Sequence, residues 1–449
     1  MTLQKGDFYF RMDGEQRFVL SRNVTSYQQT GFDTILDWTK TGGGKLVRIQ
    51  LIEGLGFGFG MTKTGGVDES WAQQWEQVFD KAYANGIYVL PVFSSWFGWN
   101  SVDGHLWKFN PLNPANGGPA TTPAELFQPG STTQTLWLNW MQALVQRWHT
   151  RPNIAGWEIF SELNLVTGAS EPKGVSFVNS AASMIRAADP NGRPITASLA
   201  DFDEWASLYR SPSLDFINFH PYPAAGQLDT YIIAKVREKL ALYNKPVLIG
   251  ESGLSAATPD SNPPTLTTAP RAPLGIKHAI WAAVVSGAMN GRALYWEDSY
   301  AIYFPTLGFP FVEKYAEADL PAANFIKGVN FAGFKPLTAV TSEQITGAAV
   351  GDDESVVGWF RDAQCEPPDW DLQPVISKQR VTLTVPGTAP HWRVDFYSAA
   401  TGTTLTSSIT VTRQGKTITI ALPDFTDDIA LKAHRLGGRR VFLPLLRVQ

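Results

Sequence analysis

The chain has 449 residues, 37 basic and 41 acidic side chains, and a formal net charge of −4. So small a charge disfavours nucleic acid or an anionic membrane as the main partner and favours an uncharged one. The length exceeds the usual size of one domain, so we expect a large domain and a smaller one. No apolar run is long enough to span a bilayer and the first residues lack signal-peptide features, so we expect a soluble protein, either secreted after signal removal or cytoplasmic.

Cys365 is the only cysteine, which excludes an intrachain disulfide and argues against a cysteine-based metal site. The six histidines show no metal-ligand spacing, so we expect neither a metal nor another cofactor. The 16 tryptophans suit stacking on the apolar faces of sugar rings and equally the filling of a large core. Composition therefore allows a carbohydrate partner and leaves the oligomeric state open.

The expected elements alternate between strands and helices. A hairpin over 8–20 turns at Asp13-Gly14, and its second arm continues into the first long strand, 17–24. Seven more strand-like runs follow, at 45–51, 87–93, 155–160, 194–199, 215–220, 246–251 and 292–296. Helical periodicity separates them, at 27–38, 69–85, 133–148, 175–188, 202–209, 228–243 and 274–287. Eight strands alternating with helices predict a (β/α)8 TIM barrel over 1–330 with the hairpin closing its floor, and an open doubly wound sheet is the alternative.

After about residue 331 the pattern changes to short alternating strands such as RVTLTV, WRVDFYS and KTITIAL, separated by turns. We therefore expect residues 331–449 to form a small all-β domain, a β-sandwich. It either binds carbohydrate or supports the barrel.

Two loops of unusual sequence could have a binding function. The segment 94–131 is longer than an ordinary barrel loop and carries Trp96, Trp99 and Trp107, which are either platforms for sugars or packing for the loop itself. The glycines of GLGFGFG, at 54–60, fall at every second position and lack the spacing of a nucleotide-binding loop. The first loop is therefore the better candidate for a binding function.

In an α/β barrel the active site lies where the C-terminal ends of the strands meet the following loops. The polar and aromatic residues at these points are Arg48, Ser161, Glu162, Asn164, His220, Tyr222, Glu251 and Trp296. Glu162 and Glu251 follow the fourth and seventh strands. Paired glutamates on facing strand ends are what glycoside hydrolysis requires, because one group protonates the leaving oxygen while the other attacks the anomeric carbon or activates water.

Four strings carry a family resemblance: WEIFSELN (157–164), DFINFHPYP (215–223), KPVLIGESG (245–253) and ALYW (293–296). In this order and spacing they resemble the retaining glycoside hydrolases of clan A, most closely family 5, over roughly residues 8–330. The resemblance implies that Glu162 is the general acid/base and Glu251 the nucleophile that forms a covalent glycosyl-enzyme.

The resemblance also implies supporting roles. Tyr222 would donate a hydrogen bond to the nucleophile, and His220 would help to hold the acid/base. Arg48 would keep Glu251 ionised, because a nearby cation favours the charged carboxylate. Trp296 would lie under the sugar in the −1 subsite.

The sequence departs from the family pattern at two positions. Ser161 stands where the family has the asparagine that binds the 2-hydroxyl of the reacting sugar, so this contact would pass to water or to Asn164. After the third strand, FSSWFGWN (93–100) replaces a frequent histidine. This string and FHPYP are similar to the mannan-cleaving branch, which makes mannan the favoured substrate over β-glucan, β-xyloside, β-galactoside or a transglycosylation acceptor.

Each assignment has a structural alternative. Glu162 and Glu251 could form structural salt bridges. A non-catalytic carbohydrate-binding barrel is the alternative from another functional class, and the presence of both glutamates argues against it. Glu158 lies inside the barrel, where a carboxylate must be paired, and we expect Arg48 to be its partner. The histidine, tyrosine and tryptophan of the strand ends could simply be core residues. Acidic residues beside the site either line the substrate groove or are ordinary exposed charges, namely Glu53, Glu297 and Asp298.

Overall fold

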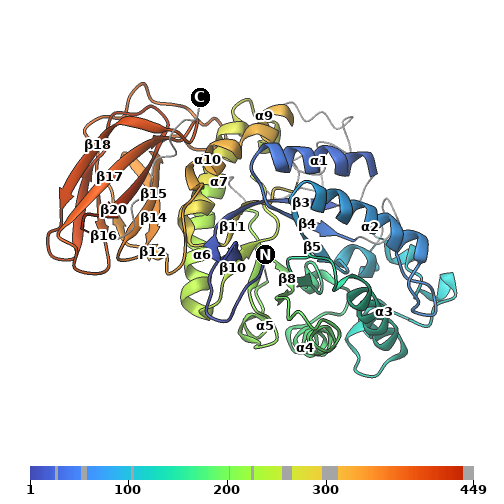
Figure 1. Ribbon diagram of the computed structural model, residues 1–449. Helices are drawn as coiled ribbons and strands as arrows, with labels where there is room; N and C mark the ends of the chain where they lie inside the picture. The colour runs from blue at the N-terminus through green and yellow to red at the C-terminus, as the bar shows by residue number, and fades with distance from the viewer. Residues whose placement is uncertain are drawn as a thin grey trace.

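The computed structural model describes residues 1–25, 29–51, 58–102, 106–201, 203–223, 227–254, 265–295 and 312–437. An α/β part and an all-β part lie side by side, with α6 (Leu228–Tyr243) and α7 (Ala272–Ser286) between them (Figure 1). Among the described residues, no helix combines the length and the apolar character needed to cross a membrane.

The α/β part is the predicted (β/α)8 barrel. Its parallel strands are β3 (Val19–Thr25), β4 (Leu46–Gln50), β5 (Tyr88–Val92), β6 (Trp157–Glu158), β7 (Ile195–Thr196), β8 (Ser198–Ala200), β9 (Ile217–His220), β10 (Val247–Ile249) and β11 (Asn290–Arg292). One run of paired strands is β11-β3-β4-β5-β6-β7 and the other is β10-β9-β8. The parallel bridge between Ser252 and Leu294 joins β10 to β11, and β7 and β8 follow each other across Ala197, so the ring of strands closes.

Two predicted strands differ in detail. The run 194–199 is interrupted at Ala197 and forms β7 and β8. The run 292–296 shares only Arg292 with β11, because Arg292 and Ala293 have φ angles of 73° and 45° and this left-handed backbone ends the strand.

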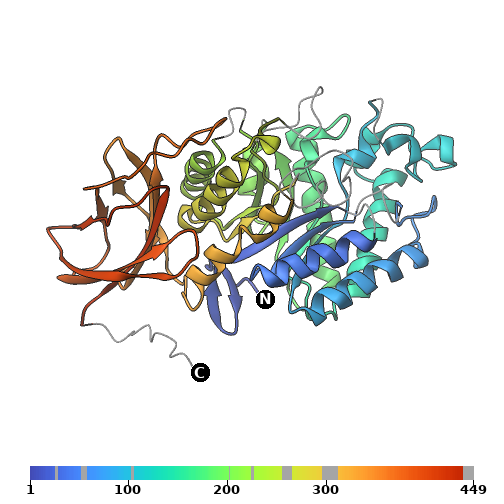
Figure 2. The ribbon, with the colours of Figure 1, turned by 90° about the horizontal axis from the view of Figure 1, so that it is seen from above.

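The helices lie on the outside of the barrel strands (Figure 2). They are α1 (Gln29–Thr41), α2 (Glu69–Ala84), α3 (Thr132–Trp148), α4 (Glu171–Ala188), α5 (Ala206–Arg210), α6 and α7, followed by α9 (Val312–Glu317) and α10 (Leu320–Ile326). Helix α2 begins where the Asp68 side chain accepts a hydrogen bond from the Trp71 N–H and ends at Asn85. Helix α7 is buried almost all round because it separates the barrel from the β sheets.

Helix α4 begins four residues before the predicted start at 175. Pro172 occupies its first turn, where a missing N–H costs nothing. Gly174 leaves room for the indole ring of Trp205, since a Cβ at Gly174 would lie 2.2 Å from that ring. Proline and glycine are common in loops, so the sequence pattern predicted the start of α4 too far along the chain.

The hairpin consists of β1 (Phe10–Met12) and β2 (Glu15–Arg17). Asp13 and Gly14 have φ angles of 51° and 83°, as the predicted tight turn requires. The ring of Phe10 lies 6.3 Å from that of Phe216, which directly precedes β9. The hairpin therefore packs at the N-terminal end of the strands, opposite the end where an active site is expected.

The all-β part has two antiparallel sheets, ordered β12-β14-β15-β20-β17-β18 and β13-β16-β19. The strands are β12 (Lys335–Leu337), β13 (Ala339–Val340), β14 (Ile345–Gly351), β15 (Ser355–Asp362), β16 (Arg380–Thr384), β17 (His391–Ser398), β18 (Thr404–Thr412), β19 (Thr417–Ala421) and β20 (Asp428–Arg435). Side chains of both sheets, such as Phe360, Trp392 and Leu383, share one apolar core. This is the small C-terminal β domain predicted from the alternating pattern. The domain boundary at residues 330 and 331 stays a prediction.

The described residues of the loop after β5 include four short 3-10 turns. They are η1 (Trp96–Trp99), η2 (Leu106–Phe109), η3 (Pro114–Asn116) and η4 (Pro123–Phe127). Two more such turns, η5 (Leu163–Leu165) and η6 (Thr265–Thr268), follow β6 and β10.

Candidate active site

Two glutamates and a histidine meet at the C-terminal end of the barrel strands. Glu162 follows β6, His220 ends β9 and Glu251 follows β10. Nδ1 of His220 lies 2.8 Å from Oε1 of Glu162 and 3.7 Å from Oε2 of Glu251. One side-chain oxygen of each glutamate and this nitrogen lie within 4.8 Å of one another. The barrel thus brings together two carboxyl groups from strands that are far apart in the sequence.

Arg48 contacts this cluster through Glu251, and the residue is 1% exposed. Its Nε and Nη2 donate to the two oxygens of Glu158, each at 2.7 Å, which confirms the predicted pairing of these two residues. Its Nη1 donates to Oε1 of Glu251 at 2.9 Å and to Oδ1 of Asn23 at 2.8 Å. Arg48 therefore has a structural partner, Glu158, and a partner in the site, Glu251.

Glu251 receives hydrogen bonds on both of its oxygens. Arg48 and the amide of Gln50 donate to Oε1, and the hydroxyl of Tyr222 donates to Oε2 at 3.0 Å. A carboxylate whose two oxygens both accept hydrogen bonds is held in one orientation. The three donors therefore fix the direction of the Glu251 side chain.

Glu162 has different surroundings. Burial raises the pKa of its carboxyl group to about 7, against the opposing effects of the Arg48 charge and a hydrogen bond from the Trp96 side chain. Its backbone is in the left-handed region, with φ 55° and ψ 52°. Its N–H donates to the hydroxyl of Ser198 at 3.1 Å, which helps to hold this unusual conformation. The two carboxyl groups therefore have different environments: burial raises the pKa of Glu162, and hydrogen bonds on both oxygens orient Glu251.

His220 is buried, and this burial lowers its pKa to about 4 despite the nearby Glu251 charge. The imidazole is therefore neutral at pH 7, and it adds no positive charge that would draw the proton off Glu162.

Other predicted site residues lie in different places. The hydroxyl of Ser161 accepts from Nη2 of Arg48 at 2.9 Å, so it faces the buried network. The side-chain amide of Asn164 binds the backbone at the end of β8 and just after it, where its Nδ2 donates to the carbonyls of Ala200 and Asp203. Its amide is thus engaged away from the two carboxyl groups.

The tryptophans differ from one another. Trp99 is buried, donates to the hydroxyl of Ser94 at 3.0 Å and lies 5.7 Å from the ring of Trp107, so it packs the loop. Trp96 is only partly buried and contacts Glu162 as a hydrogen-bond donor. The predicted residues Trp296 and Glu297, together with Glu53 and Asp298, lie outside the described residues.

Three polar residues complete the hydrogen-bond network around Arg48 and the glutamates but were not predicted from the sequence: Asn23, Gln50 and Ser198. Gln50 lies two positions after Arg48 on the same strand, so both side chains point to the same face. Ser198 donates to Oε1 of Glu158 at 2.9 Å. A polar residue at an inward position of a largely apolar strand is the signal that would have identified Gln50 and Ser198, whereas β3 carries several polar residues and gives no such signal for Asn23.

The Glu162, His220 and Glu251 cluster has the residue types of a metal site. Its ligand atoms already contact protein groups, because both oxygens of Glu251 accept hydrogen bonds and Nδ1 of His220 lies 2.8 Å from Oε1 of Glu162. The arrangement therefore suits two carboxyl groups acting by themselves better than it suits a metal ion.

Comparisons with known proteins agree with this geometry. Residues 13–285 match the family model "Cellulase (glycosyl hydrolase family 5)". A family 5 glycoside hydrolase from Bacteroides vulgatus ATCC 8482 is similar in structure, with 12% identity, a TM-score of 0.66, and coverage of 98% of this chain and 94% of that one. A search of curated proteins found no significant match.

Two other solved structures are also similar to this chain. The endo-1,4-beta-mannanase from Rhizomucor miehei is 12% identical, with a TM-score of 0.51, and the match covers 72% of this chain and 99% of that one. A family 30 subfamily 8 xylanase from Clostridium acetobutylicum is 12% identical, with a TM-score of 0.54, and the match covers 94% of this chain and 97% of that one. At such identities these structures indicate a shared fold, and the family rests on the match to the family model.

Proposed function

Because this chain belongs to glycoside hydrolase family 5, we propose that it is a retaining β-glycosidase in which Glu162 is the general acid/base and Glu251 the nucleophile. The observation that carries this proposal is the short separation of the two carboxyl groups, which have oxygens within 4.8 Å of each other. Retaining enzymes hold their carboxyl groups about 5–5.5 Å apart, whereas inverting enzymes need about 6.5–9.5 Å to admit a water molecule.

The raised pKa of Glu162 and the hydrogen bonds that orient Glu251 support the division of roles. In the first step Oε of Glu251 attacks the anomeric carbon while Glu162 gives its proton to the departing oxygen, and the glycosidic bond breaks. In the second step Glu162, now ionised, takes a proton from water. The water oxygen attacks the same carbon and releases Glu251, so the sugar leaves with its original configuration.

For the substrate we propose a β-mannan or an oligosaccharide derived from one. The strings FSSWFGWN and FHPYP support this choice, and the similar solved structures include mannanases from Rhizomucor miehei and Thermotoga petrophila. A β-glucan, a β-xylan, a β-galactoside or a transglycosylation reaction is the alternative. The ranking is tested by comparing kcat/KM for aryl β-mannoside, glucoside, xyloside and galactoside, and then for mannan and cellulose oligomers. A higher kcat/KM on any series other than the mannosides would overturn the substrate proposal and leave the mechanism untouched.

The mechanism is tested with Glu251→Ala and Glu162→Ala on an activated aryl β-glycoside with added azide. Azide should restore turnover of Glu251→Ala by forming the α-glycosyl azide, because it replaces the missing nucleophile. With Glu162→Ala it should form the β-glycosyl azide, because it attacks the glycosyl-enzyme. Hydrolysis by both variants at the wild-type rate, or first release of the α-anomer by the wild type, would contradict the proposal.

A further inference from the structure

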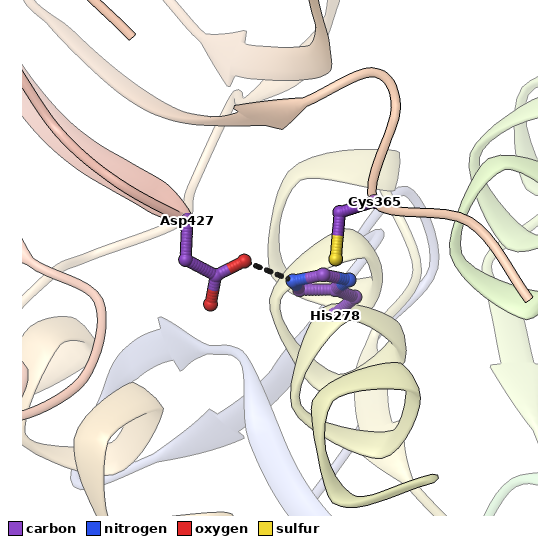
Figure 3. Close-up of side chains that lie close together, drawn as sticks. All are labelled: His278, Cys365 and Asp427. Atoms are coloured by element: carbon purple, nitrogen blue, oxygen red, sulfur yellow. Dashed lines mark hydrogen bonds and ion pairs between the residues drawn. The ribbon is translucent and has the colours of Figure 1, made fainter. Parts of the chain in front are cut away.

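A second cluster of metal-ligating side chains lies where the barrel meets the β sheets. His278 belongs to α7, Cys365 follows β15 and Asp427 directly precedes β20 (Figure 3). Nε2 of His278 lies 2.8 Å from Oδ1 of Asp427, and the ligand atoms of all three residues lie within 4.8 Å of one another. Figure 3 shows the sulfur of Cys365 directed toward the imidazole ring.

The residue types and their spacing suit zinc. Imidazole nitrogen, thiolate sulfur and carboxylate oxygen are its ordinary protein ligands. Zinc–ligand bonds of about 2.0–2.3 Å put the ligand atoms of a tetrahedral site roughly 3.3–3.8 Å apart. The His278–Asp427 separation of 2.8 Å lies below that range, and all three ligand atoms lie within 4.8 Å of one another, so small side-chain rotations would place three ligands around an ion and a water molecule would take the fourth position.

Cys365 is the least explained member of the cluster. It is 1% exposed, and among the residues that the structure describes its thiol has no hydrogen-bond partner. Nη1 of Arg361 donates to the Cys365 carbonyl at 3.1 Å and holds the loop that presents the sulfur. The loop thus holds the thiol beside an imidazole and a carboxylate, which is the position that a metal ligand would need.

Lys277 also contacts the cluster. It forms ion pairs with Asp427 and with Asp428, the latter at 2.8 Å. The carboxylate of Asp427 can therefore turn toward a bound ion while Lys277 keeps Asp428 as its partner.

Contacts outside the three ligands stabilise their positions. The indole N–H of Trp359 donates to Oδ2 of Asp428 at 3.0 Å, and the ring of Trp359 lies 5.7 Å from that of His278. The backbone N–H of Asp362 donates to the carbonyl of Asp427 at 2.9 Å. Such outer contacts orient metal ligands. The side chain of Asp427 is 13% exposed, which gives an ion a route of entry.

We propose that His278, Cys365 and Asp427 form a structural zinc site that ties α7 of the barrel to the C-terminal β sheets. The spacing of the histidines could not reveal it, because the three ligands come from distant segments of the chain. The site would act on stability, since anything that binds only the folded state stabilises that state.

The first experiment uses the full chain without a histidine tag, purified, dialysed and analysed by elemental mass spectrometry. We expect zinc at about one ion per chain and a melting temperature that falls with chelator and recovers with added zinc. Exchange with cobalt(II) should give a thiolate-to-cobalt charge-transfer band in the near ultraviolet. Absence of bound zinc together with absence of that band would reduce the cluster to an ion-pair network and overturn the proposal.

The second experiment compares Cys365→Ser with His391→Ala, which removes an exposed histidine of the β part. Cys365→Ser should lose the cobalt band and at least tenfold in zinc affinity. His391→Ala should keep both. Retention of the band in Cys365→Ser would place the metal elsewhere and overturn the assignment. If that variant does not fold, the cobalt spectrum of the wild type alone still decides whether sulfur binds the metal.

Discussion

Arg48 forms a two-pronged ion pair with Glu158, in which Nε and Nη2 each donate to one carboxylate oxygen at 2.7 Å. The pair lies inside the barrel and leaves Nη1 of the same guanidinium group for Glu251. The position of the proposed nucleophile therefore depends on a carboxylate that does not touch it.

The first prediction concerns this pair. Glu158→Gln should lower the free energy of unfolding by about 3–5 kcal/mol, because removing one partner leaves the Arg48 charge buried without compensation. Denaturation followed by tryptophan fluorescence measures the change. Glu69→Gln is the control, since it breaks the solvent-exposed pair with Arg147 and should cost no more than about 1 kcal/mol. Equal losses in the two variants would mean that Arg48 finds another partner.

The second prediction concerns pH. Because Glu162 must be protonated to assist the leaving group and its pKa is about 7, kcat/KM should fall as the pH rises through about 7. Trp96→Phe removes a hydrogen bond that favours the charged carboxylate, so the pKa should rise and the alkaline limb should move to higher pH. The pH profile of kcat/KM measures this shift. Phe97→Leu, which changes the neighbouring ring, should leave the limb in place, and a shift of equal size in both variants would refute the role of the indole.

The third prediction concerns Gln50. Gln50→Ala should lower kcat/KM about 10- to 100-fold, because it removes a hydrogen bond to a charged carboxylate. Gln50→Glu places a second carboxylate beside Glu251, so the acidic limb of the pH profile should move to higher pH. Gln73→Ala, on the exposed side of α2, is the control. An unchanged acidic limb in Gln50→Glu would show that Gln50 does not act through Glu251.

The fourth prediction separates two roles of Ser161. Ser161→Ala removes an acceptor for Arg48 and should lower kcat/KM on every aryl β-glycoside by a similar factor, about two- to tenfold. Ser161→Asn adds an amide that is long enough to reach a sugar, so it should change the ratio of the mannoside and glucoside rates. Steady-state kinetics on both glycosides measures this ratio. A constant ratio in Ser161→Asn would remove this position from the determinants of sugar choice.

The fifth prediction concerns the C-terminal β part, which we propose supports the barrel. A protein of residues 1–330 should be insoluble or melt well below the full chain, because His278 of α7 would lose Trp359 and Phe325 of α10 would lose Tyr397, which exposes side chains that are now buried. The loss of the Arg361–Asp229 ion pair would add to this effect. A soluble, active barrel with an unchanged melting temperature would favour a separate binding module instead.

Much of the barrel could be predicted because its strands are apolar runs and its helices have regular periodicity. Strand β4, with all five residues buried, and helix α6, with both ends as predicted, are examples. The interruption at Ala197 and the left-handed end of β11 were not predictable, because they depend on contacts across the barrel and not on local pattern. The turn at Asp13-Gly14 was predictable because those residue types suit its positive φ angles.

The candidate site was predictable where a residue's position along a strand decides its place. Glu162, His220 and Glu251 follow that rule. Asn164 does not, because its amide is engaged by backbone groups after the fifth strand, which local sequence does not encode. The three ligands of the proposed zinc site come from distant segments and have no common sequence motif.

The left-handed backbone of Glu162 has a consequence for protein engineering. A residue other than glycine in this region costs about 1–2 kcal/mol, and burial of a carboxyl group adds to that cost. Glu162→Gly would relieve both and should give a protein that melts at a higher temperature while losing its proton donor. Screens that select for thermostability alone would therefore enrich inactive variants at this position, and selection for heat resistance here needs to be coupled to turnover.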